Sequence, residues 1–281
     1  MDRALSRETE GASVTPRNGK LVLITGASAG LGAAFARAYA ARGYDLALVA
    51  RRVDRLDALA AELTAAHGVE AFSFGADLAV YEIEKVVLDA VAARGRVVDI
   101  LVNNAGFSIP QSFAAVPWSQ QQSFLMTLVV SACGLAHGVL PGMVERGDGA
   151  IINVASLAGF SPGMAGHTLY PAAKSLAIKF SEALACEYAA KGVRVTALCP
   201  GFTRTEFALA NGTQAVMDAS PRMFFQLAEP VIENAIRANE RGKVVVIPGW
   251  HNKVAAFLLR HLPEALVKAV LAAGSKRFHL D

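Results

Sequence analysis

Two side chains that can exchange a proton lie four residues apart in the second half of the chain. Tyr170 and Lys174 stand in the stretch YPAAK, and on a helix this spacing puts both on one face. A free phenol loses its proton near pH 10, and a neighbouring cation lowers that pKa because it stabilises the phenolate. The pair therefore predicts a general acid and base, with Tyr170 moving the proton and Lys174 lowering its pKa.

A serine hydroxyl stands at the end of a predicted strand upstream of this pair. Ser156 closes the apolar run AIINVAS at 150–156, so it should lie on the side of the sheet where ligands bind. Its hydroxyl can hold a substrate oxygen in line with Tyr170. A tyrosine and lysine at this spacing, taken alone, are more often a surface pair on a helix. Ser156 is what favours the catalytic interpretation.

A second chemical signal is a turn of small residues between a strand and a helix. Gly26, Gly30 and Gly32 follow the apolar run LVLIT. Glycines there let backbone N–H groups approach an anion, and the helix N-terminus adds the positive end of its dipole. The turn predicts a pyrophosphate site, although its spacing differs from the G-x-G-x-x-G fingerprint.

The elements that position these residues repeat as strand, helix, strand. Continuous apolar runs indicate strands buried on both faces, as in a parallel sheet covered by helices. We expect an α/β fold, a Rossmann-type doubly wound parallel sheet of about seven strands. The expected strands are 20–25, 45–50, 70–76, 99–104, 150–156, 193–199 and 243–248.

The domain organisation follows from the segments outside this rhythm. We expect a flexible arm over 1–18, one domain over 19–250, and an amphipathic helical extension over 251–281. An irregular stretch, 206–230, is expected to be an insertion near the substrate. The apolar run 254–274 contains Pro263 and charged side chains, so two short helices are expected, with contact to a membrane surface as an alternative.

Composition narrows the partners and the compartment. The net charge of +3 has no basic block behind it, so no nucleic acid is expected. The three cysteines are scattered, which indicates reduced thiols and a cytoplasmic protein. The six histidines do not cluster, so no metal is expected.

Several motifs together resemble one enzyme family. The glycine turn is followed by Asp77-Leu78, NNAG at 103–106, NVAS at 153–156, YPAAK at 170–174 and CPGFTRT at 199–205. Their order and intervals resemble the classical short-chain dehydrogenase/reductase family over residues 18 to 250. The resemblance implies a nicotinamide-dependent oxidoreductase that interconverts a carbonyl and a secondary alcohol, with Ser156, Tyr170 and Lys174 as catalytic residues. Lys174 would also bind the nicotinamide ribose, and Tyr170 would also contact the cofactor.

The same resemblance implies where the rest of the cofactor would lie. The pyrophosphate would lie along Gly26, Gly30, Leu31 and Gly32, and the adenine between Asp77 and Leu78. The adenine ribose would lie over Asn104, Ala105 and Gly106. The nicotinamide amide would be covered by Pro200, Gly201, Thr203 and Thr205.

The choice of cofactor is predicted from the end of the second strand. NAD-selective relatives usually carry an acid there, which binds the ribose 2′-OH. This chain has Arg51 and Arg52, and guanidinium groups suit a 2′-phosphate. Ser28 in the glycine turn could donate another hydrogen bond. We therefore expect NADP(H) and not NAD(H).

One position departs from the family pattern. An asparagine that helps to hold a water beside the catalytic lysine is replaced, by our count, by Leu128. The backbone carbonyl there could still hold that water if the helix is locally bent. The departure leaves an alternative function open, a weakly active or non-catalytic NADP(H)-binding sensor or assembly protein.

Substrate and assembly are predicted from apolar residues. Large apolar side chains expected near the pocket suggest an apolar substrate, although ordinary loop packing explains them equally well: Phe107, Phe160, Met164, Phe202, Phe207, Met223, Phe224 and Phe225. Helices over 119–145 and 168–191 are apolar on more than one face, as Leu125, Leu128, Val129 and Leu135 illustrate. We expect them to pair in a homodimer or homotetramer.

Overall fold

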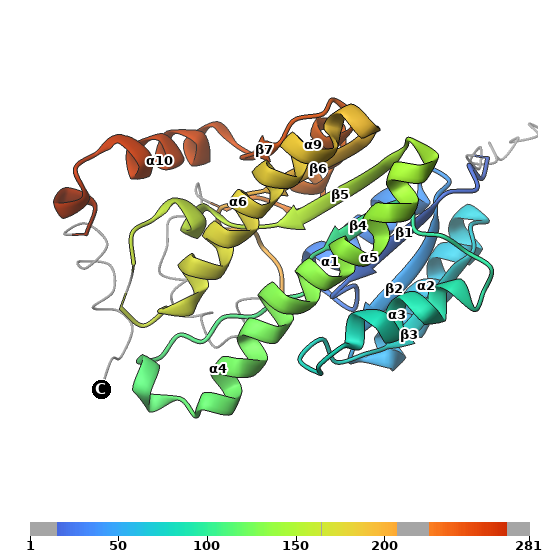
Figure 1. Ribbon diagram of the computed structural model, residues 1–281, viewed down its shortest axis with the longest axis horizontal. Coiled ribbons are helices and arrows are strands. Elements are labelled where there is room, and N and C mark those ends of the chain that lie inside the picture. The colour runs from blue at the N-terminus through green and yellow to red at the C-terminus, as the bar shows by residue number, and fades with distance from the viewer. Residues whose placement is uncertain (1–15, 164, 207–224, 269–281) are drawn as a thin grey trace, which may run out of the picture.

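The protein has the doubly wound sheet that its sequence predicts. The computed structural model describes residues 16–163, 165–206 and 225–268. Seven parallel strands lie in the order β3-β2-β1-β4-β5-β6-β7 (Figure 1). They are β1 (Leu21–Thr25), β2 (Asp45–Ala50), β3 (Ala71–Gly75), β4 (Ile100–Asn103), β5 (Gly149–Val154), β6 (Val193–Leu198) and β7 (Val245–Val246).

Helices cover both faces of this sheet, which is why its central strands are apolar throughout. One face packs against α1 (Gly30–Ala40), α2 (Val53–His67) and α9 (Ala228–Glu240). The other packs against α3 (Ile83–Ala92), α5 (Ser131–Arg146) and α6 (Leu169–Tyr188), on the near side in Figure 1. Leu23 and Ile24, neighbours in β1, face opposite cores and are both fully buried.

The strand order reverses at β1, which pairs with β2 on one side and β4 on the other. In open α/β sheets ligands bind outside the carboxyl ends of the strands at such a reversal. The glycine turn leaves β1 at this point, and Asn104 follows β4 there. The topology therefore places the predicted cofactor residues beside the predicted catalytic ones.

A long helical segment, residues 118–146, carries a local defect. It consists of α4 (Trp118–Leu125), the π-helix η2 (Met126–Val130) and α5. By length and composition the segment could cross a membrane, since an 18-residue stretch of it has a mean hydropathy of 1.8. However, α5 supplies Leu135 and Met143 to the core beneath the sheet, which is the usual reason for such a composition in a core helix.

The beginning of the described chain is held against the domain. Arg17 donates two hydrogen bonds, of 3.0 and 2.7 Å, to the buried carboxylate of Asp45. Burial opposes ionisation of Asp45, but hydrogen bonds from Arg17, Arg96 and the Glu70 N–H keep its pKa below the usual value. The last three residues of the expected arm therefore bind the domain; residues 1–15 lie outside the described part.

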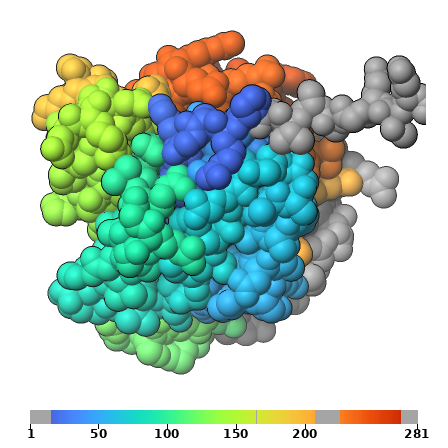
Figure 2. Space-filling model, turned by 90° about the vertical axis from the view of Figure 1, so that its right-hand side faces the viewer, coloured from blue at the N-terminus to red at the C-terminus, as the bar shows by residue number. Residues whose placement is uncertain are grey.

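The C-terminal helix α10 (Trp250–His261) packs against the 3₁₀ helix η3 (Leu157–Phe160). The Arg260 guanidinium lies 4.2 Å from the centre of the Phe160 ring. Helical residues continue over 264–268 after Pro263, and 269–274 lie outside the described part. Figure 2 shows blue and cyan N-terminal segments covering one side of the molecule, with orange C-terminal segments along its upper edge.

Candidate active site

The structure brings Tyr170 and Lys174 together at the start of α6. Lys174 is buried, and its Nζ lies 5.6 Å from the centre of the Tyr170 ring. Nζ donates a 2.7 Å hydrogen bond to the carbonyl oxygen of Val154, at the end of β5. Burial lowers the pKa of Lys174 to about 8, because the ammonium has lost most of its contact with water.

Ser156 joins this pair from the loop after β5. It is the N-cap of η3, where its Oγ accepts a 3.2 Å hydrogen bond from the Ala158 N–H. Burial raises the pKa of Tyr170, and a hydrogen bond with the Ser156 side chain lowers it in part. The predicted triad is therefore assembled within one site.

The direction of the Tyr170 pKa differs from the sequence-based expectation. We expected Lys174 to lower it, yet burial has the larger effect. The reason is geometric: Nζ faces the ring and gives its hydrogen bond to Val154. A lowered phenol pKa at this site needs a further cation close to the hydroxyl.

The glycine turn has the shape required to hold a pyrophosphate. Gly26 and Gly30 have φ values of +66° and +57°, which side chains rarely adopt. A Cβ on Gly32 would lie 2.3 Å from the carbonyl oxygen of Gly26, so no larger residue fits. Backbone at the N-terminus of α1 is thus left open to an anion, next to Leu31.

Two side chains lock this turn to the end of β4. Thr25 Oγ1 accepts hydrogen bonds from the backbone N–H groups of Asn104 (2.9 Å) and Ala105 (3.0 Å). In return, Asn104 Nδ2 donates to the carbonyl oxygen of Thr25, at 2.8 Å. The NNAG segment therefore fixes the floor of the nucleotide site, with Gly106 continuing toward Leu128.

The residues expected at the two ends of the cofactor lie along the same edge of the sheet. Leu78 is buried, and the exposed Asp77 accepts a hydrogen bond from the Ala79 N–H. At the other end Thr203 Oγ1 donates to the carbonyl oxygen of Gly201, at 3.2 Å. Gly201 follows Pro200 and is backed by Asn252, whose Oδ1 lies 2.3 Å from where a Cβ would be.

The basic end of the site contains two residues that the sequence analysis missed. Arg52 Nη2 donates a 3.0 Å hydrogen bond to Ser28 Oγ, and Arg51 is exposed beside it. Arg55, one turn later on α2, forms an ion pair of 2.7 Å with Glu206. The spacing of Arg52 and Arg55 at the start of a helix could have indicated Arg55, but no sequence pattern indicates Glu206.

Leu128 lies within the π-helix and under the catalytic helix. It is buried with Ile109, Phe124 and Ala173, and its Cγ is 3.4 Å from a Cβ built on Gly106. The N–H of Ser131 reaches back five residues to the carbonyl oxygen of Met126. This wide turn deforms the helix locally at position 128, as expected if a backbone carbonyl there is to hold the water.

A small cavity, too small for a substrate, adjoins Tyr170. Ile109, Phe124 and Leu169 line it together with the polar Gln111, Gln121 and Thr168. Phe107 packs edge-on against Phe124, with ring centres 5.5 Å apart. Of the other apolar residues expected near the substrate, Phe160 packs under Arg260 and Phe202 beside Phe225; Met164, Phe207, Met223 and Phe224 lie outside the described residues.

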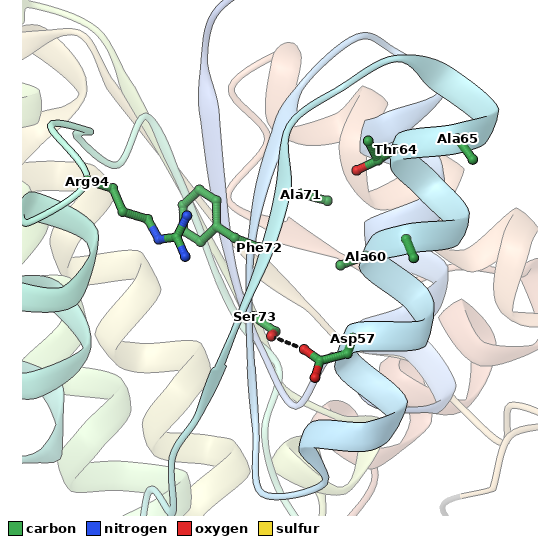
Figure 3. A pocket seen from close by; sticks show the side chains of 9 residues that line it. Asp57, Ala60, Thr64, Ala65, Ala71, Phe72, Ser73 and Arg94 are labelled. Carbon is green, nitrogen blue, oxygen red and sulfur yellow. Dashed lines mark hydrogen bonds between the residues drawn. The ribbon is translucent and has the colours of Figure 1, made fainter.

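A larger surface hollow lies elsewhere, between α2 and the edge strand β3 (Figure 3). Asp57 and Ser73 are hydrogen-bonded at its lower end in that view, and Arg94 stacks on Phe72 at 4.4 Å. Neither the glycine turn nor Tyr170 lines it. Size alone therefore does not locate the chemistry of this protein.

Comparison with known proteins identifies the family. The family model for short chain dehydrogenases matches residues 20–216. An uncharacterised oxidoreductase of Myxococcus xanthus (strain DK1622) is 32% identical over 250 residues, 89% of this chain and 95% of that protein. The solved short-chain dehydrogenase from Sphingobium yanoikuyae in complex with NADPH is 34% identical, with a TM-score of 0.75 over 91% of this chain and 95% of its own.

A solved 7β-hydroxysteroid dehydrogenase is 27% identical, with a TM-score of 0.79 over 90% of this chain and 97% of its own. These matches cover both the glycine turn and the Tyr170–Lys174 pair, so they confirm the resemblance that the motifs indicated. The chain belongs to the short chain dehydrogenase family of oxidoreductases.

Proposed function

We propose that this oxidoreductase uses NADP(H) to interconvert a carbonyl and a secondary alcohol on an apolar substrate. The observation that carries the proposal is the convergence of Ser156, Tyr170 and Lys174 at the carboxyl end of β5. The glycine turn and the Thr25–Asn104 lock lie on the same edge of the sheet. A proton donor and a dinucleotide cradle are thus adjacent.

The proposed roles follow from the geometry. When bound, the nicotinamide would supply or accept the hydride, and its positive oxidised form would stabilise a phenolate. Tyr170 donates a proton to the substrate oxygen in reduction and removes it in oxidation. Ser156, whose side chain lies close enough to the Tyr170 hydroxyl to lower its pKa, orients that oxygen. Lys174 is buried beside Tyr170; its ammonium, protonated below pH 8, would bind the nicotinamide ribose and, together with the oxidised nicotinamide, would favour the phenolate.

The preference for NADP(H) is supported by the basic end of the site. Arg52 and Ser28 are already hydrogen-bonded to one another, and Arg51 adds a second guanidinium. The Sphingobium relative was solved with NADPH. An apolar substrate is supported by the apolar cluster around Tyr170, which includes Ile109 and Phe124, and by the similarity to a 7β-hydroxysteroid dehydrogenase.

The alternative, a sensor or assembly protein that binds NADP(H) without turnover, rests on Leu128. We favour the enzyme because the triad is complete.

We also propose a cytoplasmic homodimer or homotetramer. Leu128 and Leu135, which the sequence analysis took for part of its contact surface, are buried within the protomer. The exposed Trp118, Val130 and Leu176 remain for that surface.

The deciding experiment follows NADPH oxidation with a panel of bulky and acyl ketones, repeated with NADH. We expect turnover with NADPH that falls when Arg51 or Arg52 is changed to alanine, because each removes charged hydrogen bonds to the 2′-phosphate. Equal rates with both cofactors, unaltered by either substitution, would contradict the cofactor assignment. Tight NADPH binding with no turnover on the whole panel would favour the sensor.

A further inference from the structure

A carboxylate lies among the basic side chains assigned to the 2′-phosphate. Glu206 Oε2 is 2.7 Å from Arg55 Nη1 and 3.8 Å from Arg52 Nη1. The three side chains are 54%, 45% and 47% exposed, respectively. Ion pairs this exposed contribute little to stability and exchange partners readily. The cluster is therefore open to a competing anion.

The position of Glu206 is set by the backbone that crosses the nucleotide site. Its neighbour Thr205 lies against the glycine turn, with its Cβ 3.3 Å from where a Cβ on Gly30 would be. Arg55 is 151 residues away in sequence, in the first turn of α2. The segment after β6 thus passes the pyrophosphate turn and delivers an acid to the end of β2.

A 2′-phosphate and the Glu206 carboxylate need the same guanidinium donors. A phosphate monoester carries nearly two negative charges at neutral pH, and a carboxylate a few ångströms away opposes its binding. The 2′-OH of an unphosphorylated ribose has no such conflict, since a carboxylate can accept its hydrogen bond. Glu206 consequently acts on NADP(H) and NAD(H) in opposite directions.

We propose that Glu206 is a specificity-determining residue. Its carboxylate binds Arg52 and Arg55 in competition with the 2′-phosphate, and it thereby reduces the preference for NADP(H) over NAD(H). Arg55 becomes a further guanidinium for the phosphate once Glu206 is displaced. The inference rests on the proposed function, because it takes Arg52 and Ser28 as the 2′-phosphate site.

The test uses calorimetric titration of the full chain with two probes, adenosine 2′,5′-bisphosphate and 5′-AMP. They share the adenosine and 5′-phosphate and differ in the 2′-phosphate. We expect Glu206→Gln to tighten the bisphosphate about fivefold and to leave 5′-AMP unchanged or slightly weaker. Glu62→Gln is the matched control, because Glu62 pairs with Arg37 at 2.8 Å on the surface of α1 and α2, and it should change neither.

A double-mutant cycle tests the part assigned to Arg55. In the Glu206→Gln background, Arg55→Ala should weaken the bisphosphate about fivefold. In the wild-type background its effect should be smaller, because Arg55 is there engaged by Glu206. Additive effects of the two substitutions would overturn this coupling.

The outcomes separate this inference from the function beneath it. If Arg52→Ala weakens only the bisphosphate but Glu206→Gln does not tighten it, or tightens both probes alike, Glu206 has no part in specificity and the inference is wrong. If the wild type binds both probes equally and Arg52→Ala alters neither, the proposed NADP(H) preference fails, and this inference fails with it.

Discussion

The Nζ atom of Lys174 lies 5.6 Å from the centre of the Tyr170 ring, yet its hydrogen bond goes to the carbonyl oxygen of Val154. The lysine is thus held by the end of β5 at a fixed depth beneath the tyrosine. Burial raises the pKa of Tyr170 and lowers that of Lys174 to about 8, so at neutral pH the phenol is neutral while the ammonium is still charged. A neutral phenol is the form that can donate a proton to a carbonyl oxygen.

Changing Tyr170 to phenylalanine should nearly abolish hydride transfer while leaving NADPH binding intact. The substitution removes only the hydroxyl, and a positioned proton donor contributes about 10²–10⁴-fold to a rate. Single-turnover oxidation of bound NADPH by a ketone found in the screen measures this step, and NADPH titration serves as the control. A Tyr170→Phe protein that reacts as fast as the wild type would refute the mechanism.

Lys174 should make stability depend on pH in a defined window. Its pKa is about 8 in the folded protein and 10.5 when unfolded. Below pH 8 both states are protonated, so the folded protein bears the full penalty of about 3 kcal/mol for the buried charge. As the pH rises from 8 to 10.5 the folded state loses its proton first, and the penalty disappears.

Lys174→Met isolates this effect when compared with the wild type by urea unfolding. Between pH 7.5 and 10.5, the unfolding free energy of the wild type should rise by about 3 kcal/mol relative to that of Lys174→Met. Lys179→Met, at an exposed site on the same helix, should show no such shift. A pH-independent difference for Lys174→Met would show that the ammonium is not penalised by burial.

The exposed apolar side chains Val130 and Leu176 should lie in a subunit contact. Each lies on one of the two helical segments expected to pair, and each is about 40% exposed within the protomer (42% and 39%). Light scattering at micromolar concentration should give a dimer or tetramer mass, and Leu176→Glu should reduce it. Val97→Glu, at an exposed valine outside those helices, is the control. A monomeric wild type would end the proposal.

The outer side of α10 should bind anionic membranes if the membrane alternative holds. Trp250, Val254, Phe257 and Leu258 are exposed along it, and Lys253 adds positive charge. Flotation with vesicles containing phosphatidylserine should recover the wild type but not Phe257→Asp. Val97→Asp again controls for surface charge. Recovery of neither protein would contradict membrane binding, and equal recovery of both would show that the outer face of α10 is not the membrane contact.

The fold was predictable because a sheet buried on both faces leaves continuous apolar runs, as LVLIT at β1 does. The placement of Ser156, Tyr170 and Lys174 in one site was predictable because each stands beside a recognisable strand end or on one helix turn. Glu206 was not, since only the folded backbone brings it to Arg55. The depth of Lys174, and hence its low pKa, likewise depends on neighbours distant in sequence.

The π-helix makes the effect of Leu128 testable. A leucine side chain cannot hold the water expected beside Lys174, but a backbone carbonyl of the deformed turn over Met126–Val130 could hold it instead. Leu128→Asn should therefore change the single-turnover rate by less than about tenfold, a much smaller effect than that of Tyr170→Phe.

Leu128→Asn should also lower the unfolding free energy by about 1–3 kcal/mol, because a buried amide replaces apolar contacts with Phe124 and Ile109. Leu135→Asn, buried in the core beneath the sheet, controls for stability loss without a change near the lysine. If the wild type binds NADPH but reduces no ketone until asparagine stands at 128, the leucine has disabled the proton path and the sensor function is the correct one.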